Sequence, residues 1–225
     1  MNKNLSKRII TSFLLLILLS ISLLINKYFW LILLLVVSII SFHEFNNLTK
    51  KIFKRKKKLI YLLNFISGLY FVIFISTSYD VYSHPPSGLI FIILICIFSD
   101  SGGYFIGKLI GGKKLTKISP NKTIAGSIGS FIFSLFPLII YLLIFLYTNN
   151  SGFYPKNLIE IIFLSLFLSL VCQSGDLFIS YFKRKAKVED TGTILPGHGG
   201  LLDRIDGAIF VIPAAFIIDK LFFYI

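Results

Sequence analysis

Long apolar blocks restrict the fold of this chain more than any other feature. Each block runs for about 18 residues or more, the length that a helix needs to cross a hydrocarbon core. The 225 residues are 56% hydrophobic with a mean hydropathy of +0.84, above the roughly 45–50% apolar share of soluble domains. We therefore predict an all-α polytopic integral membrane protein with about seven transmembrane helices, at residues 9–25, 28–47, 59–78, 88–106, 124–146, 157–179 and 204–225.

The N-terminus has the layout of a signal peptide, with basic residues before an apolar run, but no small-residue cleavage site follows it. We expect an uncleaved first span. The chain is interpreted as one membrane domain, 1–225. Its N-terminal spans occupy residues 1–87, and its catalytic part occupies residues 88–225 with cytoplasmic loops at 107–123 and 180–204.

The distribution of basic residues predicts the orientation. If the N-terminus is cytoplasmic, all but three of the 23 Lys and Arg residues fall on the cytoplasmic side, the exceptions being Lys27, Lys156 and Lys220. This is the asymmetry of the positive-inside rule, and it places the C-terminus outside. The net charge of +13 is thus explained by topology, and no nucleic-acid partner is expected. We predict a multi-pass protein of a bacterial-type inner (cell) membrane, with its active site on the cytoplasmic side.

The basic loops differ in character. The run from Lys50 to Lys58 is almost purely basic, so we interpret it as an orientation signal that touches anionic headgroups of membrane lipids. The loops 108–123 and 183–204 also contain Gly, Pro, Ser, Asn and Asp. That mixture indicates binding sites.

Most of the ten acidic residues also fall on the cytoplasmic side. Asp100 and Asp176 lie in or at the end of apolar spans, where a carboxylate needs a cavity, a cation or a partner. Asp203 and Asp206 are three residues apart, so on a helix they share one face. Such oxygen ligands suit Mg²⁺. The inner-side acids are Glu44, Asp100, Asp176, Glu189, Asp190, Asp203 and Asp206.

A structural interpretation of these acids stays open. The carboxylates could pair with Lys183, Arg184 and Arg204 and only neutralise a helix–loop–helix joint. A polar stripe of Gln173, Asp176, Ser180, Lys183 and Arg184 at helical spacing descends into that joint. For Glu44, beside His43, we expect an ion pair or a helix-end cap.

Two segments are rich in glycine. In residues 98–111, Gly102 and Gly103 suit either helix packing or an anion site, and Ser119, Asn121, Lys122 and Thr123 follow them. The second segment, residues 195–206, has three glycines around His198. Its bare backbone, with Gly199 and Gly200, is expected to wrap a phosphate with N–H groups, next to the start of a helix near Asp203.

The stretch SGDLFISYFKRKAKVEDTGTILPGHGGLLDRIDG, residues 174–207, resembles the signature of phosphatidate cytidylyltransferases, and FSDSGGYFIGKLIG and SPNKT resemble further blocks of that family. The resemblance implies transfer of a cytidylyl group from CTP to phosphatidic acid, with Mg²⁺ and room for a second cation. It implies metal ligation by Asp176, Asp203 and Asp206 and catalytic roles for these three with Lys183 and Arg204. The substrate-binding residues are then Asp100, Ser119, Asn121, Lys122, Thr123, Ser180, Arg184, Lys187, His198, Gly199 and Gly200.

One position departs from the family pattern, because Glu189-Asp190 stands where the family usually has Lys-Asp. Lys185 or Lys187 is our hypothesis for the missing charge. The alternatives are a CTP-dependent polyprenol or lipid kinase, a membrane transporter and a non-catalytic lipid-binding scaffold. A homodimer is compatible with the sequence.

Overall fold

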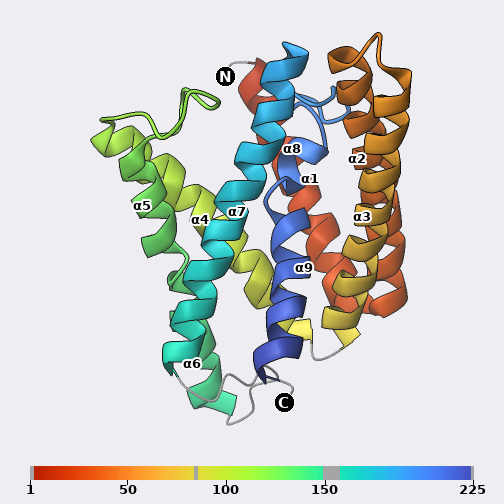
Figure 1. Cartoon of the computed structure of the whole chain (residues 1–225). Helices are drawn as coiled ribbons and strands as arrows, with labels where there is room; N and C mark the ends of the chain where they lie inside the picture. Colours follow the sequence, from red (N-terminus) through yellow and green to blue (C-terminus); the bar gives the residue numbers. More distant parts are fainter. Residues whose placement is uncertain (1–2, 84–85, 149–157, 224–225) are drawn as a thin grey trace. The chain divides into compact units, whose positions relative to one another are not determined.

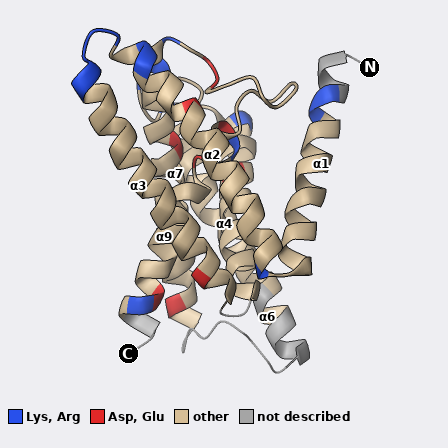
Figure 2. Cartoon of the chain, turned by 90° about the vertical axis from the view of Figure 1, so that its right-hand side faces the viewer, with Lys and Arg blue, Asp and Glu red and all other residues tan. Residues whose placement is uncertain are grey.

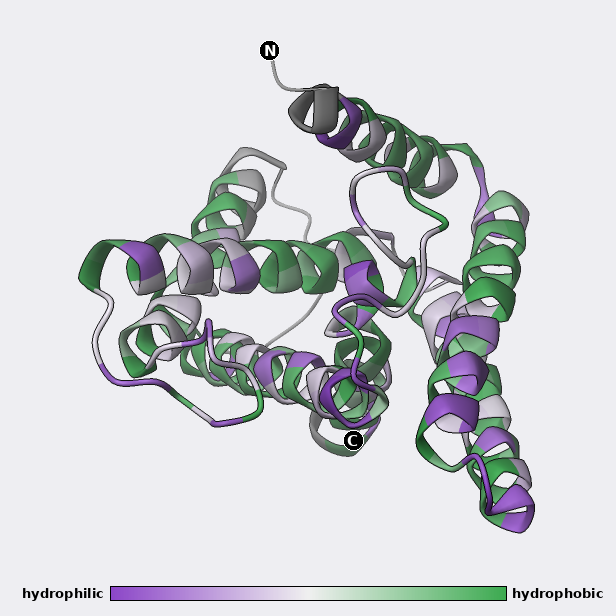
Figure 3. Cartoon of the chain, turned by 90° about the horizontal axis from the view of Figure 1, so that it is seen from above, coloured by the Kyte–Doolittle hydropathy of each residue, from purple (hydrophilic) through white to green (hydrophobic). Residues whose placement is uncertain are grey.

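The computed structural model describes residues 3–83, 86–148 and 158–223, and these are almost entirely helical (Figure 1). Within them, five helices are long and apolar enough to cross a membrane: α1 (Lys3–Ile25), α2 (Lys27–Ile52), α3 (Lys57–Ser83), α4 (Pro86–Ile110) and α7 (Leu158–Ala186). Hydrophobic residues make up most of the helical ribbon (Figure 3). The prediction of an all-α polytopic membrane protein is confirmed.

The predicted span 124–146 is wrong as a single helix. Two shorter helices replace it, α5 (Ile124–Phe133) and α6 (Phe136–Thr148). The break at Ser134 and Leu135 has a local cause, because the Pro137 ring would clash with the Phe133 carbonyl in a continuous helix and Pro137 has no N–H to donate. Ser134 instead bonds its hydroxyl to the Phe131 carbonyl, at 2.7 Å.

The predicted span 204–225 is also interrupted. The structure has α8 (Leu202–Ile205), then α9 (Ala208–Ile218) and a π-helical turn at Asp219–Phe223. The chain turns at Asp206 and Gly207, where a Cβ added to Gly207 would lie 2.5 Å from the Cys172 Sγ atom. Only glycine allows this approach to Cys172.

The chain divides into two compact units. Unit 1 comprises residues 1–79 and 182–205, and unit 2 comprises residues 80–181 and 206–225. The predicted division into N-terminal spans (1–87) and a catalytic part (88–225) concerns function, and it stays a prediction.

In unit 1, α2 and α3 form an antiparallel hairpin. Polar side chains join them near the turn, since Asn64 donates to Asn46 at 2.7 Å and accepts from Thr49 at 3.0 Å. Further along, the rings of Phe42 and Phe71 pack edge to face, 6.3 Å apart. The α1 helix joins α2 at Asn26, whose side chain caps α2 by accepting the N–H groups of Tyr28 and Phe29. Residues of α1 and α2 also contact the segment that follows α7.

In unit 2, glycines allow α4 and α5 to approach closely. A Cβ added to Gly102 would lie 2.6 Å from the Gly129 carbonyl oxygen, and one added to Gly126 would lie 2.8 Å from that of Gly103. This confirms the packing interpretation of Gly102 and Gly103. The close contact fixes the start of α5, and hence the loop that carries Lys122.

Candidate active site

The α7 helix ends in a turn that sets the direction of the next loop. Lys187 has a positive φ of 55°, and the Val188 N–H bonds the Lys183 carbonyl at 3.1 Å. This is the Schellman ending of a helix, in which the left-handed residue is usually glycine. We call residues 187–201 the α7–α8 loop.

The α7–α8 loop contains a tight turn around its histidine. Leu195 and Gly199 form a bridge, in which the Leu195 N–H bonds the Gly199 carbonyl at 2.9 Å. Gly199 has a φ of +82°, and a Cβ there would lie 2.6 Å from the Asp190 carboxyl carbon. Glycine is therefore required at this position by conformation and by space.

Asp203, at the start of α8, is a centre of hydrogen bonds within unit 1. Its Oδ1 atom pairs with Lys183 Nζ at 2.7 Å, and the two side chains are only 7% and 14% exposed, respectively. Its Oδ2 atom accepts from the Thr191 N–H and hydroxyl at 2.8 and 2.9 Å and from the Gly200 N–H at 3.1 Å. The structural pairing with Lys183, considered as the alternative role, is therefore present.

Glu44 reaches the same place from α2. It is 2% exposed and accepts the N–H groups of Leu201 at 3.0 Å and Leu202 at 2.8 Å. It thus caps the short α8 helix, which confirms the expectation of a helix-end cap.

These contacts correct the expected phosphate cradle. The Gly200 N–H, which we expected to face a phosphate, donates to the Asp203 carboxylate, and the next two N–H groups, of Leu201 and Leu202, donate to Glu44. Two internal carboxylates thus occupy the donors at the start of α8. The substrate role of Gly199 stays a prediction.

His198 is held by α1. Its Nδ1 and Nε2 atoms lie 2.6 Å from the Thr11 hydroxyl and 3.1 Å from the Ser12 hydroxyl, and Arg8 donates to the Gly197 carbonyl at 2.8 Å. Partial burial and the positive charges of Arg204 and Arg8 lower the pKa of His198 below its usual 6.5, which favours the neutral ring. A direct substrate contact by His198 stays a prediction.

Other cations of this region are accessible. Arg184, Lys187 and Arg204 are exposed, and Arg204 also donates to the His198 carbonyl at 2.9 Å. Such side chains can contact phosphate oxygens without first breaking a buried ion pair.

A second group of predicted residues lies in unit 2, where residues 111–123 form a hairpin-like loop. Leu115 N–H bonds the Lys122 carbonyl at 2.9 Å, and Thr123 caps α5 by accepting the Gly126 N–H at 3.0 Å. This places the Lys122 ammonium on the Asp176 carboxylate of α7. Asn121 is exposed and Ser119 half-buried, and their substrate roles, like that of Thr123, stay predictions.

Further polar groups surround this ion pair. Ser180 donates to Asp176 Oδ1 at 3.2 Å. Asp100 of α4 interacts electrostatically with both Asp176 and Lys122, and Cys172 does so with Asp100 and Asp206. Cys172 is fully buried and Cys96 is buried, both as free thiols. The carboxyl groups of Asp100, Asp176 and Asp206 and the ammonium group of Lys122 thus all belong to unit 2.

The predicted metal ligands are divided between the units, with Asp203 in unit 1 and Asp176 and Asp206 in unit 2. Among residues 3–83, 86–148 and 158–223, no three His, Cys, Asp or Glu side chains form a group that could hold a metal by themselves. The carboxylate oxygens around Asp176 fit Mg²⁺, which takes one or two carboxylates and leaves its other positions to water and phosphate. Asp203 fits less well, because its oxygens already accept several hydrogen bonds.

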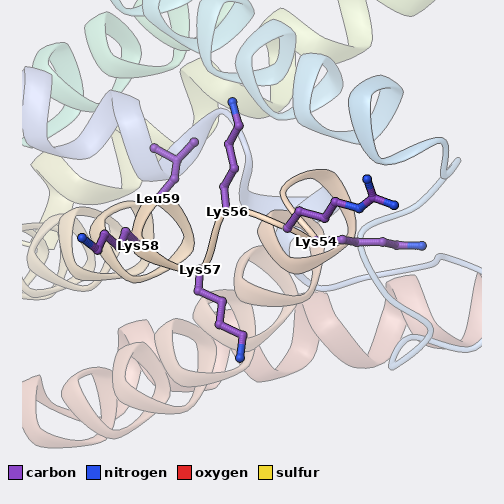
Figure 4. A pocket seen from close by; sticks show the side chains of 6 residues that line it. Lys54, Lys56, Lys57, Lys58 and Leu59 are labelled. Atoms are coloured by element: carbon purple, nitrogen blue, oxygen red, sulfur yellow. The ribbon is translucent and has the colours of Figure 1, made fainter.

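The basic turn between α2 and α3 has a different geometry. Its Lys and Arg residues gather at one end of these two helices (Figure 2), but Lys56, Lys57 and Lys58 point in different directions (Figure 4). Side chains that diverge do not converge on one anion, and this agrees with the interpretation of the run as an orientation signal.

Sequence reasoning missed the roles of Thr11, Ser12 and Thr191, and it did not connect Glu44 with the α7–α8 loop. Hydroxyl residues in or beside apolar spans carry no distinct signal in a single sequence. Glu44 did carry one, as a carboxylate inside an apolar span, but its partners are more than 140 residues away.

Comparison with known proteins assigns the chain to a family. Residues 56–222 match the model of the cytidylyltransferase family. The chain belongs to the cytidylyltransferase family. The matched region includes Lys122, Asp176, Lys183 and Asp203, whereas α1 and Glu44 precede it.

Several curated relatives in this cytidylyltransferase family are similar in sequence. The chain is 34% identical over 218 residues to a phosphatidate cytidylyltransferase of Rickettsia typhi, covering 95% of this chain and 91% of that protein. It is 41% identical over 139 residues to that of Bacillus subtilis and 43% over 136 residues to that of Staphylococcus aureus. These two matches cover 60% of this chain and about half of each relative, 49% and 50%.

Proposed function

We propose that this protein is a phosphatidate cytidylyltransferase, which converts CTP and phosphatidic acid to CDP-diacylglycerol and pyrophosphate. The observation that carries the proposal is the similarity to the Rickettsia typhi enzyme over nearly the whole chain. The Lys122–Asp176 pair in unit 2 and the Lys183–Asp203 pair in unit 1 supply the charged groups that such a reaction needs.

The proposed reaction requires no nucleophile from the protein. A phosphate oxygen of phosphatidic acid attacks the α-phosphorus of CTP, forming a new P–O bond. The bond between that phosphorus and the bridging oxygen of the β-phosphate breaks, and pyrophosphate leaves with the electron pair. Negative charge accumulates on the transferred phosphoryl group, so catalysis is mainly positioning and charge neutralisation.

Each charged residue has a proposed task in this scheme. Lys122 neutralises phosphate charge, and the exposed Arg184 and Arg204 contact substrate phosphates. Asp176 would hold Mg²⁺ together with carboxylates near it, and the bound ion would act as a Lewis acid on a phosphoryl oxygen. Asp203 would serve as a metal ligand only if an ion replaced one of its present hydrogen bonds. We further propose that the site faces the cytoplasm of a bacterial inner membrane, as the basic loops indicate.

The test is incubation of the purified protein with CTP labelled at its α-phosphate, phosphatidic acid and Mg²⁺. We expect label in the lipid fraction and stoichiometric pyrophosphate. Release of CDP with phosphorylation of a lipid alcohol would instead show the kinase alternative. Wild-type turnover in Asp176→Asn would contradict the role given to Asp176. The control variant is Lys117→Gln, which changes an exposed residue of the loop that also carries Lys122, the partner of Asp176.

A further inference from the structure

We propose that Glu44 of α2 is a positioning residue that fixes the α7–α8 loop and the start of α8. Its effect on turnover rests on the proposed function, whereas its effect on the loop does not. Glu44 lies outside the region matched by the family model, which begins at residue 56.

The contacts of Glu44 all belong to the far end of the chain. Oε1 accepts the Leu201 N–H at 3.0 Å, and Oε2 accepts the Leu202 N–H at 2.8 Å and the Thr191 hydroxyl at 2.9 Å. A carboxylate that is 2% exposed would be costly to bury without such donors. The three bonds therefore hold residues 191 and 201–202 against α2.

The loop is shaped to receive this carboxylate. A Cβ added to Gly192 would lie 2.4 Å from Glu44 Oε1, and one added to Gly200 would lie 2.6 Å from Oε2. Any side chain at either position would displace the carboxylate or the loop. The two glycines thus leave space that Glu44 fills.

Thr191 links Glu44 to Asp203. Its hydroxyl lies 2.9 Å from Glu44 Oε2 and 2.9 Å from Asp203 Oδ2, so one hydroxyl hydrogen serves two carboxylates. Asp203 in turn pairs with Lys183 and accepts the Gly200 N–H. A change at Glu44 is therefore transmitted to the orientation of Asp203, although Glu44 itself is buried among protein groups.

The experiment compares Glu44→Gln with Ser41→Ala in the full chain in detergent. Glutamine keeps the size of the side chain but turns an amide donor toward the N–H groups. Ser41 lies one turn earlier on α2, is fully buried, and its hydroxyl has no hydrogen-bond partner among the described residues. Two quantities are measured: hydrogen–deuterium exchange of the amides at 191–202, and the kinetic constants for CTP and for phosphatidic acid.

For Glu44→Gln we expect exchange at Leu201 and Leu202 at least about tenfold faster, as befits loss of a charge-assisted hydrogen bond. We expect kcat/KM for CTP to fall by about 100-fold, the effect of a misplaced group, with the KM for phosphatidic acid unchanged. Ser41→Ala should match the wild type in both. A general folding defect would instead raise exchange along all of α2 and leave both KM values unchanged.

Unchanged exchange at Leu201 and Leu202 in Glu44→Gln would overturn the inference. If that variant does not fold, Thr191→Val tests the same link, and wild-type exchange and kinetics in it would also overturn the inference. Faster loop exchange in a protein that shows no cytidylyl transfer would leave Glu44 in its role and refute the proposed function. Cytidylyl transfer by the wild type, together with equal exchange in Glu44→Gln and the wild type, would support the proposed function and refute the role of Glu44.

Discussion

Lys183 and Asp203 form a nearly buried ion pair, with Nζ 2.7 Å from Oδ1, that joins the last turn of α7 to the first turn of α8. The same carboxylate accepts the N–H groups of Thr191 and Gly200. Asp203 therefore holds both ends of the α7–α8 loop together with Glu44, and the loop cannot shift without breaking a charge-assisted bond.

Asp203→Asn should abolish most turnover. Asparagine has a single acceptor oxygen, so either Lys183 or the loop N–H groups lose their partner, and a misplaced site costs about 100-fold in rate. Initial rates with labelled CTP measure this loss. Glu189→Gln removes one negative charge from the same loop at an exposed position and should stay near wild type. Equal losses in both variants would show that loop charge, not Asp203, is responsible.

Two substitutions at Lys187 separate the effect of its charge from the effect of its backbone strain. Its φ of 55° costs a non-glycine residue about 1 kcal/mol or more. Lys187→Gly should therefore unfold at a higher temperature than Lys187→Ala, although both remove the charge. If the ammonium contacts phosphate, both variants should raise the KM for CTP equally. A lower melting midpoint for the glycine variant would contradict the observed turn.

Lys122→Gln should lower kcat/KM for CTP by about tenfold or more, because a charge-assisted contact with phosphate is lost and Asp176 loses its cation. Lys117→Gln, in the same loop and exposed, should have little effect. Steady-state rates over a range of CTP concentrations distinguish the two. Similar values for both variants would remove Lys122 from the site.

Gly200→Ala should be far more damaging than Gly112→Ala. The new methyl at residue 200 would lie 2.0 Å from the Thr191 Oγ1 atom, so the contacts of Thr191 with Glu44 and Asp203 must break. At Gly112, with a φ of +89° and no atom within 4 Å, only backbone strain of about 1–2 kcal/mol results. Activity and melting midpoint of both variants check this ordering.

His198 predicts a small loss of stability in acid. Its pKa is lowered in the folded state, so the unfolded chain binds more protons as pH falls through about 6.5, and folding becomes less favourable there. The stabilisation from the neutral His198 ring is present above that pH, and it is small because solvent screens the charges around the ring. Between about pH 7.5 and about pH 5.5, on either side of the ordinary histidine pKa, the melting midpoint of the wild type should fall slightly more than that of His198→Gln. A larger fall in His198→Gln would contradict the lowered pKa.

The sequence allowed the long spans to be predicted because each apolar run is itself a helix-length signal. It did not reveal the interruptions at Ser134 and Gly207, since a hydropathy average does not register single residues such as Pro137 and Gly207. Charge and spacing indicated, as the alternative interpretation, that these acids pair with Lys183, Arg184 and Arg204, and the Lys183–Asp203 pair is one such contact. The Gly200 N–H is predicted to bind phosphate, because nothing local in the sequence indicates that the Asp203 carboxylate accepts it or that Glu44 of α2 caps the residues that follow.

Hydrogen bonds from residues 8–12 and 44 to the α7–α8 loop limit how this protein can be truncated or recombined. A fragment starting at residue 56 would contain the whole matched family region yet lack the side chains that hold its most distinctive loop. A chimera that grafts residues 56–222 onto the first two helices of another protein should therefore fail unless that donor offers a carboxylate at the place of Glu44. The smallest functional fragment is therefore determined by the contacts between residues 8–44 and the α7–α8 loop, and not by the length of the matched region.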